Sequence, residues 1–166
     1  GKGEVLTMRE LDALENGERV LHTAHRTSTS SAASLRLAKL LRDKGYTEVI
    51  RVKKDETYER AYTYSKQFGL ERITILDTGA SVDFRTRTSK GGLGEGFDVL
   101  IVDEAHHAAA DTYQKVLSYF KPAFTLGLTA TPERADDKSI LEIFKNTAHK
   151  LDIQTAVEIG ELVPVR

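Results

Sequence analysis

The stretch FDVLIVDEAHH, residues 97–107, decides the fold class of this chain. Its apolar run at 99–102 is bounded by polar residues, which is typical of a strand buried on both faces of a parallel sheet. Such a strand delivers Asp103 and Glu104 to its carboxyl end, where α/β sheets place their chemistry. In phosphoryl transfer from ATP, Asp103 would hold Mg²⁺ and Glu104 would orient the attacking water. A simpler interpretation is that the two carboxylates only favour the start of the next helix.

Predicted strands and helices alternate on both sides of this stretch, which favours an α/β fold with a mostly parallel central sheet and helices on both faces. Apolar spacing and turn residues predict each segment. We expect strands at residues 19–24, 48–52, 72–76, 81–86, 99–102 and 124–128, with a hairpin turn at 77–80 and a glycine-rich loop at 89–96. We expect helices at 3–14, from 27–31 to about Gly45, and around 113–120, 140–144 and 155–159, and a helix or ordered loop at 56–68.

The composition indicates one globular domain. The chain has 166 residues, of which 40% are hydrophobic and 30% charged, and no apolar run approaches the roughly 20 residues of a membrane span. Cysteine is absent, which excludes disulfides and fits a reducing, cytoplasmic location. The formal net charge is -1, so a nucleic-acid contact has to be a local basic patch.

Two families resemble this chain. The stretch 97–107 resembles motif II, the DEAH box, of superfamily 2 helicases, and LGLTATPER at 126–134 resembles their motif III. Residues 97–166 look most like the first domain of helicases related to restriction-enzyme subunits. Residues 1–104, through the segments 1–6, 19–26 and 82–98, are similar to the ATPase of phage large terminase subunits, which package viral DNA. A join near residues 103–106, which we call the acidic box, would fit a chimera, a design or an unusual phage protein.

Both resemblances imply a P-loop ATPase domain of the RecA-like type over residues 1–166, with ATP and Mg²⁺ as cofactors. They imply that Asp103 and Glu104 are catalytic together with Lys2, which would touch the β- and γ-phosphates. The other residues implied at the nucleotide, or in coupling it to nucleic acid, are Gly1, Gly3, His106, Thr129 and Thr131. Gly3 stands where a P-loop has its Mg²⁺-binding hydroxyl. For Lys2 the alternative is a flexible chain start, and for the threonines it is turn chemistry before Pro132.

The sequence contains neither the strand that precedes a phosphate loop nor a second helicase lobe. We therefore expect a second RecA-like lobe as partner, or self-association through an exposed sheet edge.

The expected nucleic-acid contacts, with DNA or RNA, lie in two places. Arg85, Arg87, Lys90, Gly91 and Gly92 form the local basic patch, whose alternative interpretation is a solvated hairpin end. Arg26 resembles the nucleic-acid-contacting segment after the second core strand, and its alternative is helix capping.

Two other sites are disfavoured. His106 and His107 are adjacent and lack the His-Glu-x-x-His spacing of a zinc site. The tyrosines at 58, 62 and 64 are more simply an apolar face than a base-stacking platform.

We therefore expect the ATPase domain of a DNA helicase or translocase. The alternatives are a catalytically silent P-loop-like scaffold and a nucleic-acid-binding module without turnover.

Overall fold

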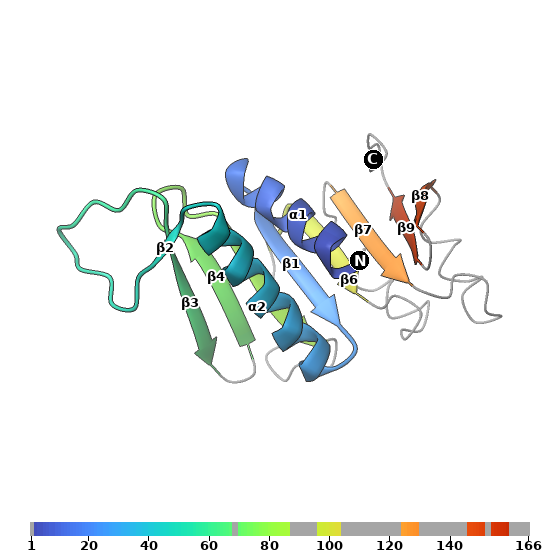
Figure 1. Ribbon diagram of the computed structural model, residues 1–166, viewed down its shortest axis with the longest axis horizontal. Coiled ribbons are helices and arrows are strands. Elements are labelled where there is room, and N and C mark those ends of the chain that lie inside the picture. The colour runs from blue at the N-terminus through green and yellow to red at the C-terminus, as the bar shows by residue number, and fades with distance from the viewer. Residues whose placement is uncertain are drawn as a thin grey trace.

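The computed structural model describes residues 2–67, 70–86, 96–103, 124–129, 146–151 and 154–159. These residues form two helices and nine strands (Figure 1). In chain order the elements are α1 (Lys2–Glu15), β1 (Arg19–Ala24), α2 (Thr27–Asp43), β2 (Thr47–Glu48), β3 (Ala61–Gln67), β4 (Leu70–Ile75), β5 (Ser81–Thr86), β6 (Val99–Asp103), β7 (Phe124–Thr129), β8 (Asn146–Leu151) and β9 (Gln154–Ile159).

All nine strands join one sheet in the order β2-β3-β4-β5-β1-β6-β7-β9-β8. The central strand β1 pairs in parallel with β5 and β6, and β6 pairs in parallel with β7. The pairs β3–β4, β4–β5, β7–β9 and β8–β9 are antiparallel. The α/β class is confirmed, but the sheet is mixed rather than mostly parallel. Strands joined by short connections, such as β4 and β5, pair antiparallel because a parallel pair needs a longer crossover.

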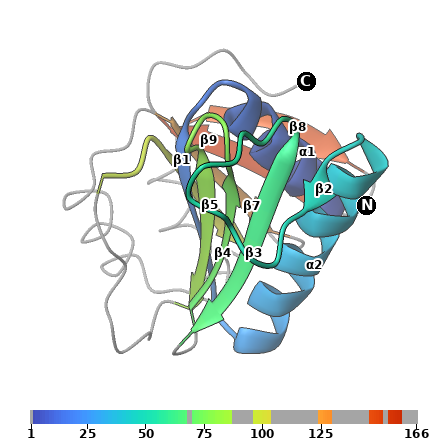
Figure 2. The same ribbon diagram turned by 90° about the vertical axis from the view of Figure 1, so that its left-hand side faces the viewer.

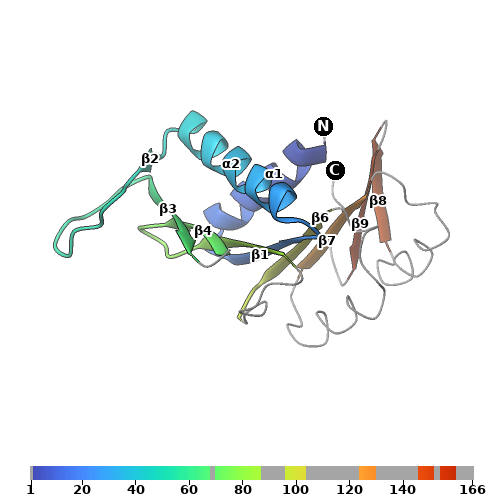
Figure 3. The same cartoon turned by 90° about the horizontal axis from the view of Figure 1, so that it is seen from below.

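The two described helices lie side by side on one face of the sheet (Figures 2 and 3). The helices expected at 113–120 and 140–144, which would bear on the second face, lie outside the described residues. Neither of the two described helices is long and apolar enough to cross a membrane.

Helical periodicity explains the core between the helices and the sheet. Leu6 and Leu14 of α1 and Leu37 and Leu41 of α2 are buried against the inner faces of the strands. Leu35 is 56% exposed. It lies two residues before Leu37, a spacing that places two helical side chains on different faces.

Helix α2 begins without a side-chain cap, so the alternative role of Arg26 in helix capping is not seen as a side-chain hydrogen bond. Arg26 occupies the N-cap position with extended backbone, and no side-chain hydrogen bond caps the helix. The helix ends as expected, because Gly45 follows it with φ +92°, a conformation that favours glycine.

Three predicted segments were wrong. The strand expected at 48–52 is reduced to β2, which pairs with β3 at Thr47 and Glu48. Val49 N–H still donates to Tyr62 O, but Ile50 beyond it is 87% exposed. The segment expected as a helix or loop at 56–68 contains strand β3, in which Tyr62 and Tyr64 share the face that contacts α2. Tyr62 is part of the core and Tyr64 packs against it. Aromatic residues at a spacing of two favour a strand, so this signal was present in the sequence.

The helix expected at 155–159 is instead strand β9, paired with β7. Thr155, Val157 and Ile159 are β-branched and alternate, a pattern that favours a strand. The strands expected at 19–24, 72–76, 81–86, 99–102 and 124–128 are confirmed to within two residues. So is the turn at 77–80, where Ile75 N–H donates to Ala80 O.

Candidate active site

The carboxyl ends of four strands meet at one edge of the sheet. Because β5, β1, β6 and β7 are parallel neighbours in that order, Thr86, Ala24, Asp103 and Thr129 end next to one another. Helix α1 precedes β1 and is joined to it by a short turn at Asn16-Gly17, so the two elements run in opposite directions. The first residue of α1, Lys2, therefore lies toward the edge at which β1 ends (Figure 1). The fold therefore brings Lys2, Asp103 and Thr129 to one side of the sheet.

Several predicted site residues lie outside the described part of the chain. These are Gly1, Glu104, His106, Thr131, Arg87, Lys90, Gly91 and Gly92. Of Lys2 and Thr129 the structure describes the backbone, at the first residue of α1 and the last residue of β7.

Asp103 is the last residue of β6, and its residue surface is 2% exposed. All five residues of this strand are buried, as the apolar run predicts. The carboxylate of Asp103 points to the helix-covered face, where its Oδ2 lies 3.1 Å from Nε2 of His22. A buried carboxylate whose orientation is held by a hydrogen-bond partner has the chemistry of a cation ligand.

His22 lies in the middle of β1 and links two carboxylates. Its Nδ1 lies 2.5 Å from Oε2 of Glu10 on α1, and the side chains of both residues are fully buried. The imidazole also packs beside the ring of Phe84 on β5, with the ring centroids 5.2 Å apart. We refer to Glu10, His22 and Asp103 as the buried triad.

The protonation of the triad follows from its contacts. Burial by itself lowers the pKa of His22, but the charges of Glu10 and Asp103 and the hydrogen bonds to them outweigh burial and raise it to about 9. Burial raises the pKa of Glu10, and His22 opposes this shift. With both ring nitrogens facing carboxylate oxygens, a doubly protonated ring donates a hydrogen bond to each of them.

Sequence reasoning missed Glu10 and His22, although both carried a signal. Glu10 stands four residues after Leu6 and four before Leu14, so the helical period places a carboxylate on the buried face of α1. His22 interrupts the apolar run that begins at Val20 in this strand. What the sequence does not reveal is that these two polar residues face each other.

The two predicted nucleic-acid positions within the described residues differ in environment. Arg26 is exposed just after the end of β1. Arg85 lies on β5 with a side chain only 12% exposed, and its Nη2 donates to Oδ2 of Asp83 at 3.1 Å. Asp83 is fully buried and also accepts two hydrogen bonds from Arg72, at 2.6 and 2.8 Å. Arg85 therefore has a structural partner, and its contact with nucleic acid remains a prediction.

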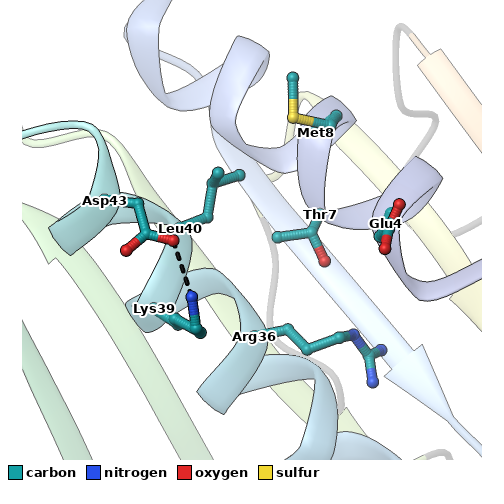
Figure 4. A pocket seen from close by; sticks show the side chains of 7 residues that line it. All are labelled: Glu4, Thr7, Met8, Arg36, Lys39, Leu40 and Asp43. Atoms are coloured by element: carbon teal, nitrogen blue, oxygen red, sulfur yellow. Dashed lines mark hydrogen bonds and ion pairs between the residues drawn. The ribbon is translucent and has the colours of Figure 1, made fainter.

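A groove of about 460 Å³ separates α1 from α2 (Figure 4). Glu4, Thr7, Met8, Arg36, Lys39, Leu40 and Asp43 line it. Arg36 extends from α2 toward the first turn of α1. A Cβ atom added to Gly3 would lie 2.6 Å from Nε of Arg36, so the guanidinium occupies the space that a side chain at position 3 would need.

The comparison that decides the family covers most of the chain. The sequence profile of the family described as "Type III restriction enzyme, res subunit" matches residues 4–134. The chain belongs to this family. It is a P-loop domain of the superfamily 2 helicase type, which confirms the resemblance drawn from the acidic box. The profile runs without a break across residue 104, where the chimera hypothesis places a join.

Three relatives illustrate the relationship. The DNA 3'-5' translocase XPB2 of Sulfurisphaera tokodaii is 48% identical over 69 residues, which are 42% of this chain and 15% of the relative. A type I restriction enzyme EcoAI endonuclease subunit of Escherichia coli is 30% identical over 73 residues, 42% of this chain and 9% of the relative. A 51.5 kDa protein of Lactococcus phage (isolate 7-9) is 29% identical over 139 residues, 82% of this chain and 29% of the relative.

The phage relative gives weak support to the terminase resemblance. The matched regions span less than a third of each of these relatives. No solved structure matches this chain.

Proposed function

We propose that residues 1–166 are the first RecA-like ATPase domain of a DNA helicase or translocase, in which ATP hydrolysis is coupled to nucleic-acid binding. The observation that carries this proposal is the position of Asp103. Its carboxylate is buried at the carboxyl end of β6. The first residue of α1, Lys2, lies toward the same edge of the sheet. A buried carboxylate and a helix start on one side of a sheet suit a nucleotide whose phosphates need both a cation and backbone N–H groups.

The residues present fit Mg²⁺ and ATP. Carboxylate oxygen is a ligand type that Mg²⁺ prefers, and Asp103 supplies it with its orientation held by His22. When bound, Mg²⁺ would neutralise the charge that develops on the phosphate oxygens. In this proposal Lys2 binds the β- and γ-phosphates and Glu104 orients the attacking water. Residues that couple the nucleotide site to the nucleic-acid site are Thr129, Thr131 and His106.

The family relationship supports the coupling to nucleic acid. The translocase relative acts on DNA by its name, and the restriction-enzyme relatives are subunits of larger enzymes. We propose DNA rather than RNA as the partner and a second RecA-like lobe as the structural partner. Arg26, exposed at the carboxyl edge, is the described residue best placed for the phosphate backbone.

A catalytically silent nucleotide-binding scaffold is the second candidate, and the position of Arg36 favours it. Gly3 offers no hydroxyl, and the guanidinium of Arg36 fills the space beside it. A cation at this place suits a phosphate oxygen and cannot ligate Mg²⁺.

The test is steady-state ATP hydrolysis in Mg²⁺, with and without duplex DNA. We compare the wild-type chain with Glu104→Gln and with Glu15→Gln, an exposed glutamate at the end of α1 that serves as the control. The proposal expects DNA-stimulated turnover in the wild type and in Glu15→Gln, and its loss in Glu104→Gln. Equal phosphate release by all three proteins would refute the proposal that this domain hydrolyses ATP. Binding of a fluorescent ATP analogue without turnover would identify the silent scaffold.

A further inference from the structure

The buried triad connects three elements that the proposed site uses. Glu10 comes from α1, His22 from β1 and Asp103 from β6, and all three side chains are at most 3% exposed. Glu10 lies about two turns after Lys2 on the same helix. The triad is therefore a direct polar link between the helix that begins at the phosphate end of the site and the carboxylate that would hold Mg²⁺.

Fold stability alone does not call for this cluster. Burying ionisable groups carries a desolvation penalty, and apolar side chains of similar volume are often as stabilising or more so. The neighbours of Glu10 and His22 on the same faces, Leu6, Leu14 and Val20, are apolar and fully packed. Glu10 also leaves its Oε1 buried without a hydrogen-bond partner, which is a further cost.

What the cluster achieves is a fixed orientation. Glu10 binds one ring nitrogen of His22, and Phe84 packs beside the ring. Because these two contacts fix the orientation of the ring, Nε2 contacts Oδ2 of Asp103 from one direction only. Hydrogen-bond partners behind a metal ligand generally determine its orientation and affinity.

We propose that His22 is a positioning residue that holds the Asp103 carboxylate for the metal, and that Glu10 holds His22 in turn. This inference rests on the proposed function, because it requires Asp103 to bind Mg²⁺. Neither Glu10 nor His22 touches nucleotide or metal; both act through Asp103.

Two substitutions of His22 separate its two contacts. The amide nitrogen of glutamine can replace Nε2 and keep a donor to Asp103, whereas that of asparagine can replace only Nδ1 and leaves Asp103 without this donor. We compare His22→Asn, His22→Gln and, as a matched control, Ser34→Ala. The control removes a buried hydroxyl of α2 that donates to Glu71 of β4 at 2.7 Å and, among the described residues, has no hydrogen bond to the triad. Each protein is titrated with Mn²⁺ in the presence of a non-hydrolysable ATP analogue, and metal binding is followed by electron paramagnetic resonance. The melting temperature is recorded in parallel.

The proposal expects His22→Asn to weaken Mn²⁺ binding by about 10–100-fold, the range usual for a partner behind a metal ligand. His22→Gln should restore most of this loss, and Ser34→Ala should lower the melting temperature without changing Mn²⁺ affinity. If both His22 variants only lower the melting temperature, as Ser34→Ala does, the role is structural and the inference is overturned.

A second variant covers the case in which His22→Asn does not fold. Glu10→Leu replaces the buried carboxylate by an apolar side chain, which the fold tolerates better than an unpaired charge. It should still weaken Mn²⁺ binding, because His22 loses its anchor, and unchanged affinity would overturn the role of Glu10. If the wild type itself binds no Mn²⁺ with the nucleotide, the proposed function fails and the inference fails with it. Binding by the wild type with unaffected variants removes the inference alone.

Discussion

Replacing Asp83 by asparagine should destabilise the fold by more than any single surface change. The carboxylate is fully buried on the face of the sheet opposite α1 and α2, and it accepts three hydrogen bonds from two arginines. Asparagine keeps the shape but loses the charge, so it leaves the guanidinium groups of Arg72 and Arg85 without a counter-ion. Breaking a buried ion pair in this way costs about 3–5 kcal/mol.

The exposure of the arginines reduces this figure. The Arg72 side chain is 40% exposed and can recover water, whereas the Arg85 side chain is 12% exposed and has little access to it. Discounting the Arg72 contacts for solvent screening gives an expected loss of about 2–3 kcal/mol in the free energy of unfolding. Urea unfolding followed by far-ultraviolet circular dichroism measures this loss from the shift of the midpoint.

Asp12→Asn is the matched control for Asp83→Asn. Oδ2 of Asp12 lies 3.6 Å from Nη1 of Arg9, and the Asp12 side chain is 67% exposed. Loss of this carboxylate charge should change the free energy of unfolding by no more than about 0.5 kcal/mol. The reasoning is refuted if both variants unfold at the same urea concentration. The result also bears on function, since an Arg85 needed by Asp83 is less available to a phosphate backbone.

Three further predictions concern the core, the pH dependence and a turn. Leu37→Ala should lower the free energy of unfolding by about 2–5 kcal/mol in urea, because the side chain is fully buried, whereas Leu35→Ala should change it little. Burial, followed by the hydrogen bond to Glu71, raises the pKa of Tyr64 from 10.0 to about 12, so this tyrosine contributes stability below pH 10 that is lost as the pH rises to 12. Tyr64→Phe should remove that loss from the alkaline side of the stability profile, and an unchanged alkaline slope would contradict the assignment. Gly79→Ala should lower the melting temperature, because φ at this position is +78° and an alanine there costs about 1–2 kcal/mol. The cost comes from the backbone alone, since no atom lies within 4 Å of the added methyl. An unchanged melting temperature would argue against the turn conformation.

Local pattern was sufficient wherever one strand or helix carries its own signal. The apolar run before Asp103, the leucines of α1 and α2, and the turn around Gly79 predicted their elements and the α/β class. The pattern failed where pairing partners decide the structure. Residues 48–52 have strand composition, yet only the first part finds a neighbour in β3, and Ile50 beyond it is exposed.

The sequence by itself determined the family, through the acidic box and the segment at 126–134, and it placed Asp103 at the end of a buried strand. Only the tertiary structure decided what surrounds Asp103 and Arg85. His22 and Asp103 are 81 residues apart and meet because β1 and β6 pair in parallel, while Glu10 joins them because α1 packs back on β1. Contacts of this kind depend on the strand order, and a one-dimensional pattern encodes which face a side chain takes but not which side chain it faces.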